Sequence, residues 1–231
     1  MKISKMFTIK DLERTLKSQA NPERAIAMAS YMRNKFDFYG IAAPLRHDLS
    51  KPFIKKAKAS SIIDWQLLTE LFSHKYREIN YFGLDLLKSQ SHLLTIDDFE
   101  NLISLAEIRP WWDTIDNIDS IIGRLGYGNK DFERKILDLA ENENFWLRRI
   151  AIGHQRKYKD KTNSKLLELI IKTNLKIPAK DKDEKFFIDK AIGWALREYS
   201  KTNPAWVRSF LYHQANDLSG LTIREASKYV E

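Results

Sequence analysis

Hydrophobic residues recur at helical spacing along nearly the whole chain, and no alternation typical of a β-strand persists. Only 8 glycines and 6 prolines interrupt the 231 residues. Helix starts are visible at Asn21-Pro22, where an N-cap precedes a proline at the first helical position. We expect that helix to run to about Asn34. The pattern predicts an all-α protein of about a dozen helices with short connections.

Further punctuation supports this division into helices. Residues 95–98, Thr-Ile-Asp-Asp, resemble a capping box and predict another helix start. The pairs Asn203-Pro204 and Ser219-Gly220 mark element boundaries in the C-terminal third. No composition shift or linker divides the chain, so we expect residues 1–231 to form a single domain.

Three segments share a repeated pattern, in which an aromatic residue is followed by charged residues and, seven positions on, by glycine. They span residues 76–83, 146–153 and 186–193, and a fourth start at Trp112 lacks the glycine. The starts lie 36, 34 and 40 residues apart, which suits one helix pair per repeat in a HEAT-like or armadillo-like stack. We expect the glycines to allow close helix packing, and the second helix of each pair to line a concave face.

The chain is basic, with a net charge of +8 and a pI near 9.4. Such a balance often accompanies polyanion binding, although basic charge also serves solubility. Its distribution is more informative, because residues 145–159 contain no acid and carry Arg148, Arg149, Arg156, Lys157 and Lys159. We interpret this helix as a phosphate-contacting surface.

Several chemistries are disfavoured. There are no cysteines, and the five histidines are scattered without metal-ligand spacing, so we expect no metal and no cofactor, although carboxylates alone could hold magnesium. No apolar run is long enough to span a membrane, and the first residues lack the apolar stretch of a signal peptide. These features predict a protein of the bacterial-type cytosol or nucleoid that has no contact with a membrane.

Two clusters carry candidate chemistry. Trp112 and Asp116 lie four residues apart and therefore share a helix face, whereas Asp113 is better explained as a first-turn acid. For Asp116, a structural role and a functional role remain equally open. Lys190, Trp194 and Arg197 form a stripe of cation, aromatic and cation that favours a surface for stacking and phosphate binding.

At these residues the sequence resembles the DNA alkylation repair family of the AlkD type. The resemblance rests on residues 27–36, 38–46, 111–116 (Trp-Trp-Asp-Thr-Ile-Asp), 146–149 (Trp-Leu-Arg-Arg) and 186–204. It implies an all-α, right-handed superhelical stack of HEAT-like antiparallel helix pairs around a concave basic groove. It also implies a DNA glycosylase that removes N3- and N7-alkylated purines from duplex DNA without flipping the base into a pocket.

The resemblance further implies roles for individual residues. Asp116 is expected to be the catalytic carboxylate, Trp112 and Trp194 to pack against the lesion's sugar and backbone, and Arg149 to hold a phosphate and steady Asp116. The resemblance implies supporting DNA contacts from Tyr31, Lys157 and Arg197, and the basic segment and the stripe described above add Arg148 and Lys190 as expected DNA contacts. One departure is Arg46-His47, where the family often has two arginines.

Two alternatives remain open beside a glycosylase that acts as a monomer on double-stranded DNA. A non-catalytic HEAT-repeat module that binds branched or damaged DNA explains the basic and aromatic residues equally well, and makes Asp116 incidental. A protein-binding helical scaffold is the third reading, and the acid-free basic helix counts against it.

Overall fold

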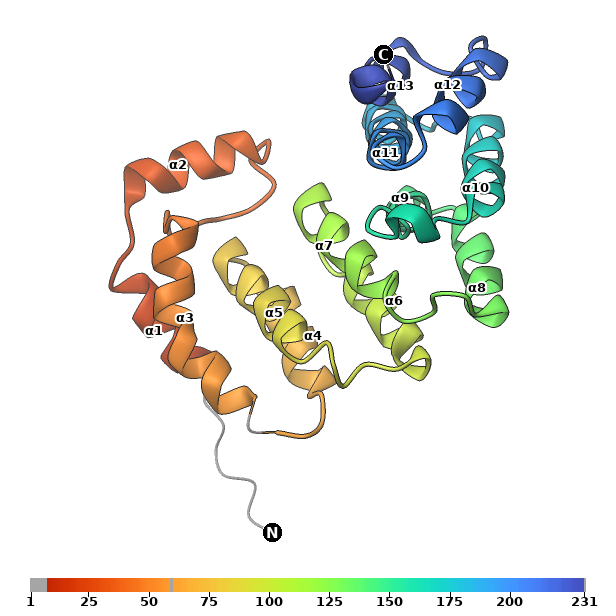
Figure 1. Cartoon of the computed structure of the whole chain (residues 1–231). Coiled ribbons are helices and arrows are strands. Elements are labelled where there is room, and N and C mark those ends of the chain that lie inside the picture. The colour runs from red at the N-terminus through yellow and green to blue at the C-terminus, as the bar shows by residue number, and fades with distance from the viewer. Residues whose placement is uncertain (1–7, 59, 231) are drawn as a thin grey trace. The chain divides into compact units, whose positions relative to one another are not determined.

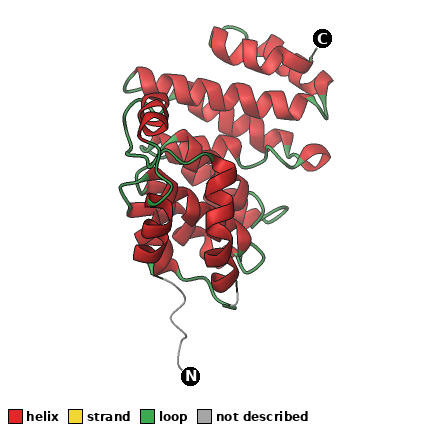
Figure 2. Cartoon of the chain, turned by 90° about the vertical axis from the view of Figure 1, so that its left-hand side faces the viewer, coloured by secondary structure: helices red, strands yellow, loops and turns green. Residues whose placement is uncertain are grey.

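The structure, a computed structural model, describes residues 8–58 and 60–230, and within these ranges it is helical without strands (Figures 1 and 2). The prediction of an all-α protein with about a dozen helices is confirmed. The α-helices are α1 Ile9–Lys17, α2 Pro22–Tyr31, α3 Ala43–Ala57, α4 Trp65–Ser73, α5 Arg77–Ser89, α6 Phe99–Glu107, α7 Trp112–Ile122, α8 Lys130–Ala140, α9 Phe145–Gly153, α10 Ser164–Lys176, α11 Lys182–Ser200, α12 Pro204–His213 and α13 Gly220–Ala226.

The helices fall into two compact units, one ending at Thr95 and one beginning at Ile96. In the first unit, α5 packs against α3 and α4, and α1 packs against α3. The loop before α3 is held by one buried carboxylate. Glu78 accepts hydrogen bonds from the main-chain amides of Tyr39, Gly40 and Ile41, at 2.9–3.2 Å. A buried loop needs such partners because its amides have no water to bond.

The second unit contains every candidate site residue except Tyr31 and is built in layers (Figure 1). Helices α7, α9, α11 and α13 follow one another side by side, since α9 packs against both α7 and α11, and α11 packs against α13. Helices α6, α8 and α10 pack against this row, with α6 against α7 and both α8 and α10 against α9. On α7, Ile115, Ile118 and Ile122 are fully buried, and their helical spacing explains how this helix faces the core.

Three of the four segments of the repeated pattern lie in this layer, on α7, α9 and α11, and the remaining one lies on α5 of the first unit. The segments begin at the starts of α5, α7 and α9 and one turn inside α11. The glycines do permit close packing. A Cβ at Gly83 would lie 3.0 Å from the ring of Phe72 on α4, and one at Gly193 would lie 2.7 Å from Cβ of Glu225 on α13. The wider expectations of a right-handed superhelix, a concave basic groove and a single domain stay predictions.

Helix boundaries agree with the sequence where a side chain caps the helix. Asn21, Asn203 and Ser219 each accept a main-chain amide hydrogen bond from the first turn of α2, α12 and α13. Two details differ. Helix α2 ends at Tyr31 rather than Asn34, since Arg33 and Asn34 adopt positive φ angles of 54° and 56°. Residues 96–98 form a 3-10 turn, so α6 begins at Phe99, later than the capping-box pattern predicts.

We predict that Gly193→Ala lowers the free energy of unfolding by about 1–3 kcal/mol, because the added methyl group meets Glu225 Cβ and the main chain of Thr222. Gly220→Ala is the matched control, since nothing lies within 4 Å of its Cβ position at the start of α13. Urea unfolding of both variants measures the difference. Equal stabilities for the two variants would contradict the close approach of α11 and α13.

A second prediction concerns acid stability. His154 is buried beyond α9, and its Nδ1 donates to the carbonyl of Ala151 at 2.6 Å. Burial lowers the pKa of His154 from 6.5 to about 4. The unfolded chain therefore binds the extra proton first, so the stability linked to this group is complete above pH 6.5 and is lost as the pH falls toward 4.

His154→Phe is expected to flatten the dependence of unfolding free energy on pH between about 6.5 and 4, because Phe cannot take up that proton. Urea unfolding across this range, on wild type and variant, isolates the contribution of one residue. The exposed His213→Gln serves as control and should leave the slope unchanged. A wild-type slope in His154→Phe would show that this group does not titrate differently on folding.

Candidate functional site

Helix α7 places the Trp-Trp-Asp-Thr-Ile-Asp segment. Trp111 precedes the helix in an extended conformation and is buried, with its ring 5.6 Å from that of Trp146 and 5.1 Å from that of Phe187. It is a core residue. Trp112 begins the helix and is half-buried, one turn before Asp116. The helical spacing thus separates the first tryptophan, which packs inside, from the face that carries Trp112 and Asp116.

Asp116 is held by a bidentate ion pair with Arg149 of α9. Arg149 Nε donates to Asp116 Oδ1 at 2.8 Å, and Nη2 donates to Oδ2 at 2.9 Å. Arg149 Nη1 donates to the carbonyl of Phe187 on α11 at 2.6 Å. The side chain of Arg149 is 4% exposed and that of Asp116 is 11% exposed. Fork geometry of this kind fixes the orientation of a carboxylate, and here it ties α7, α9 and α11 together.

A second aspartate lies one turn further along α7. Asp119 is buried, and its Oδ2 accepts a hydrogen bond from Arg156 Nη2 at 2.5 Å. The same nitrogen donates to the main-chain carbonyl of Asp116 at 3.1 Å. Burial raises the pKa of Asp119 to about 6, although the neighbouring Arg156 opposes that rise. Two arginines therefore serve two aspartates on one face of α7.

An open cleft of about 330 Å³ lies beside these pairs. Six of the seven residues that line it are polar or charged and the seventh is a tryptophan: Asp116, Asn117, Ser120, Arg156, Lys157, Glu198 and Trp194. The guanidinium of Arg156 lies 3.9 Å from the ring centroid of Trp194, and that of Arg197 lies 5.8 Å away. The structure brings Asp116, Trp194 and Lys157 to one cleft. Trp112 is not among the residues that line it.

The stripe on α11 is half-buried, and its two cations share one carboxylate. Lys190 Nζ and Arg197 Nη1 each lie 2.8 Å from a carboxylate oxygen of Glu225 on α13. The hydrogen bond from Lys190, aided by Lys228, lowers the pKa of Glu225 to about 2. The sequence predicted cations around an aromatic residue, but it did not anticipate that Glu225 partly balances their charge.

Arg148 is deeply buried. It is 3% exposed and forms an ion pair with Glu184 of α11, which is 2% exposed. Glu184 also accepts a hydrogen bond from the amide of Lys180 at 3.2 Å. A guanidinium enclosed in this way has no face to offer a phosphate, so we leave Arg148 out of the proposed DNA contacts below. Acidic side chains of other helices pair with the arginines of the acid-free basic segment, so only part of that segment forms a surface.

Two residues of the first unit also figured in the sequence analysis. Tyr31 ends α2 and is 73% exposed. Arg46 is buried on α3, where it pairs with Asp85 and lies 5.2 Å from the ring centroid of Tyr81. His47 Nδ1 lies 3.3 Å from the same carboxylate of Asp85. The Arg46-His47 pair thus packs α3 against α5.

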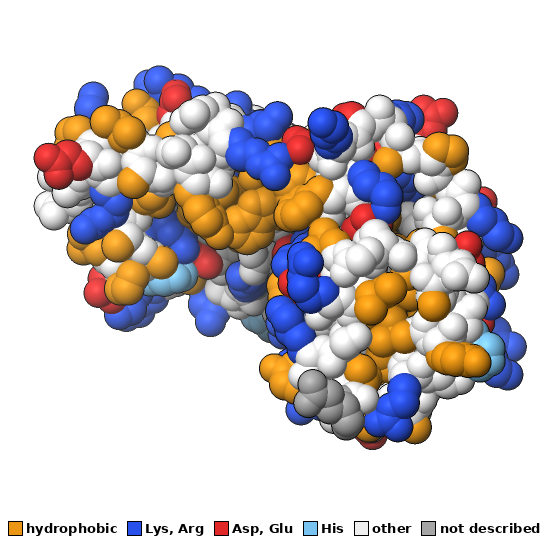
Figure 3. Space-filling model, turned by 90° about the horizontal axis from the view of Figure 1, so that it is seen from above, with side chains coloured by type: hydrophobic (Ala, Val, Ile, Leu, Met, Phe, Trp, Pro, Cys, Tyr) orange, Lys and Arg blue, Asp and Glu red, His pale blue; other side chains and the backbone are white. Residues whose placement is uncertain are grey.

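Lys and Arg side chains are prominent on the face drawn in Figure 3, interspersed with hydrophobic ones. Among residues 8–58 and 60–230, no group of three or more His, Cys, Asp or Glu side chains could hold a metal ion. Within the same ranges, no helix is both long enough and apolar enough to cross a membrane.

Sequence reasoning missed Asp119 as a member of this site, and it interpreted Arg156 as a phosphate contact and not as the partner of an aspartate. One signal was available, because Asp119 follows Asp116 by three residues and so shares its helix face. The pairing partners were not available, since Arg149 and Arg156 lie 33 and 37 residues from the aspartates they meet. Only tertiary packing brings such positions together.

Fold and site together define a class of helical protein. In it, an arginine on one helix holds a carboxylate on a neighbouring helix, beside a cleft that contains one tryptophan. Residues 12–230 match the model of the family described as DNA alkylation repair enzyme, and the chain belongs to that family. A solved structure described as a predicted DNA alkylation repair enzyme from Enterococcus faecalis is similar, with 34% identity and a TM-score of 0.81. The match covers 91% of this chain and 96% of that one. No curated protein matches the sequence.

We predict that Glu184→Ala lowers the free energy of unfolding by about 3–5 kcal/mol, because it leaves the buried charge of Arg148 without a partner. The control is Glu168→Ala on α10, whose partner Lys172 is 41% exposed and whose loss should cost less than about 1 kcal/mol. Urea unfolding followed by tryptophan fluorescence compares them. Similar small losses in both would mean that Arg148 is not locked in the interior.

Proposed function

We propose that this member of the DNA alkylation repair family is a monofunctional DNA glycosylase. Its substrates are purines carrying an alkyl group at N3 or N7 in duplex DNA. The observation that carries the proposal is Asp116, a carboxylate fixed by the bidentate Arg149 pair and partly exposed at the cleft that Trp194 and Lys157 also line. Family membership supports a role in alkylation repair.

The chemistry suits a carboxylate acting alone. An N7- or N3-alkylated purine is cationic, so it leaves readily as a neutral base when the bond from nitrogen to the sugar C1′ breaks. Positive charge then develops on the deoxyribose ring, where a fixed carboxylate stabilises it. Water adds to C1′, and its proton passes to Asp116 or to solvent. The products are the free base, an abasic site and one proton.

Arg149 serves this step by orienting Asp116. Each of its three guanidinium nitrogens donates a hydrogen bond, two of them to the carboxylate and one to the Phe187 carbonyl. The side chain is almost fully enclosed. This geometry supports the expected steadying of the carboxylate. It gives no support to a phosphate contact, so Arg149 is proposed only to steady Asp116.

The form of the cleft supports action on a base that stays in the stack. Enzymes that flip a base hold it between aromatic or apolar side chains and read its edge. This cleft is open, and Trp194 is the one aromatic residue among the seven that line it, so the lining offers no second ring to sandwich a base. Selection would then rest on the lability and charge of the lesion. Trp112 and Trp194 are proposed to contact the sugar and backbone on either side of Asp116 in the α7 and α11 layer.

Duplex DNA is the proposed partner, and a monomer suffices to bind it. Lys157 is exposed at the cleft and is the best-placed phosphate contact. Lys190 and Arg197 flank Trp194 on α11 and become available to phosphates in competition with Glu225. Tyr31 is an exposed candidate on the other unit.

Asp116→Asn is expected to lower the rate of base release by about 10²–10⁴-fold, because the amide carries no charge to stabilise the sugar cation. Affinity for DNA should be unchanged or slightly higher, since a negative charge is lost. The assay incubates protein with duplex DNA containing N7-methylguanine, in the presence of EDTA, and measures free base. DNA binding is measured separately by fluorescence anisotropy.

Asp131→Asn on α8 is the matched control, because this exposed aspartate lies outside the cleft and should leave base release at the wild-type rate. Release by wild type and control alone would support the proposal. Tight DNA binding with no release by the wild type would contradict it and favour the non-catalytic DNA-binding module.

A further inference from the structure

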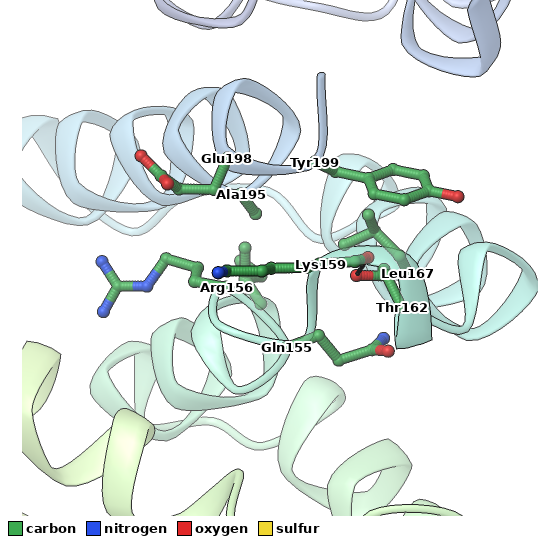
Figure 4. Close-up of a pocket in the computed structure, with 9 residues that line it drawn as sticks. Gln155, Arg156, Lys159, Thr162, Leu167, Ala195, Glu198 and Tyr199 are labelled. Atoms are coloured by element: carbon green, nitrogen blue, oxygen red, sulfur yellow. Dashed lines mark hydrogen bonds between the residues drawn. The ribbon is translucent and has the colours of Figure 1, made fainter. Parts of the chain in front are cut away.

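Arg156 lines the cleft but has no part in the catalytic step proposed above. Its side chain leaves the turn that follows α9 and runs between α9 and α11, and in Figure 4 it points to the same side as Glu198 and away from Tyr199. Its guanidinium meets three separate groups, namely the ring of Trp194 at 3.9 Å, the carboxylate of Asp119 at 2.5 Å and the main-chain carbonyl of Asp116 at 3.1 Å. One side chain therefore joins α7 to the aromatic residue on α11.

The hydrogen bonds of Arg156 show that stacking is a principal restraint on it. Nη2 makes both bonds to α7. Nε is buried and, among the residues that the structure describes, has no hydrogen-bond partner. The guanidinium carbon lies 3.9 Å from the centroid of the Trp194 ring, a distance at which a cation–π contact compensates for an unused donor. The arrangement favours the face of Trp194 over a full set of hydrogen bonds.

Asp119 is built into the packing between α7 and α9. A Cβ at Gly153 would lie 2.2 Å from Asp119 Oδ2, so the glycine of the repeated pattern makes room for this carboxylate. Ser120 Oγ donates to Oδ1 at 3.1 Å. Burial raises the pKa of this carboxylate, whereas the adjacent guanidinium of Arg156 lowers it, and the ion pair at 2.5 Å lets the carboxylate balance the charge of Arg156.

The ion pair between Asp119 and Arg156 also affects the charge beside the cleft. Asp116 and Asp119 carry two negative charges, and Arg149 and Arg156 carry two positive ones, so the cluster beside the cleft is neutral. Without Asp119, Arg156 would add an uncompensated positive charge to the lining. Such a charge repels a cationic purine and a sugar cation alike.

We propose that Arg156, held by Asp119, is a positioning residue that fixes the ring of Trp194 against the cleft and links it to the helix that carries Asp116. Its effect on base release rests on the proposed glycosylase activity. Its effect on the surroundings of Trp194 does not. The two consequences can therefore be tested apart.

The first measurement is acrylamide quenching of tryptophan fluorescence in Arg156→Met, Arg156→Lys and Asp119→Asn. Each is paired with the same protein carrying Trp194→Phe, so that the difference reports Trp194. Arg134→Met, an exposed arginine on α8, is the control. Quenching of Trp194 is expected to increase in Arg156→Met and Asp119→Asn because the ring loses its cover. In Arg156→Lys it should increase less, because an ammonium keeps the charge without the planar stack.

The second measurement is single-turnover release of N7-methylguanine beside the dissociation constant for the same duplex. Arg156→Met and Asp119→Asn are expected to lower the release rate by about 10²-fold, with the larger part of the effect in the rate and not in DNA affinity. A misplaced ring affects the reacting sugar, whereas loss of an ordinary phosphate contact weakens binding. If Asp119→Asn does not fold, by circular dichroism, the comparison of Arg156→Met with Arg156→Lys carries the test.

The outcomes separate the two proposals. Quenching of Trp194 that stays at the Arg134→Met level in both Arg156 variants overturns the positioning role, whatever the activity. If quenching of Trp194 increases in the Arg156 variants while the wild-type protein releases no base, the result supports the positioning role and contradicts the glycosylase proposal. A loss confined to DNA affinity, with an unchanged release rate, also overturns the inference, since it describes a phosphate contact.

Discussion

The bidentate pair between Asp116 and Arg149 is the interaction on which the candidate site depends. It joins α7 to α9, and through the Phe187 carbonyl it reaches α11, so the three helices that carry the site share one set of hydrogen bonds. Burying an arginine is costly unless its charge is paired and its donors are used. Arg149 meets both conditions, and Asp116 stays partly exposed and lines the cleft.

The same solution recurs along the layer. Asp119 meets Arg156, Glu184 meets Arg148, and Glu225 meets Lys190 and Arg197. The Asp119–Arg156 pair joins α7 to the turn that follows α9, and the other pairs join neighbouring helices. Such pairs specify which helix faces which, because a mismatched register would leave a charge buried without a partner. A basic chain can thereby bury several arginines and still keep Lys157 exposed at its cleft.

Glycine has a related part in the layer. Gly153 and Gly193 stand where a side chain of the next helix needs space, the carboxylate of Asp119 in one case and the Cβ of Glu225 in the other. The sequence analysis attributed these glycines to close helix packing, which is correct. Their more specific effect is to admit the acids that balance the cluster around Asp116 and the stripe around Trp194. Packing and electrostatics are therefore set by the same positions.

The sequence by itself determined the helices, because caps such as Asn21, Asn203 and Ser219 and the spacing of apolar residues act over one or two turns. It also predicted Asp116, Arg149 and Trp194 as site residues, through a local pattern and a family resemblance. Tertiary structure alone decided which charges meet. Arg148 and Arg149 are adjacent in sequence, yet one is locked against Glu184 and the other orients Asp116. Successive residues of a helix point about 100° apart, so neighbouring arginines reach different helices, and no local pattern states which ones.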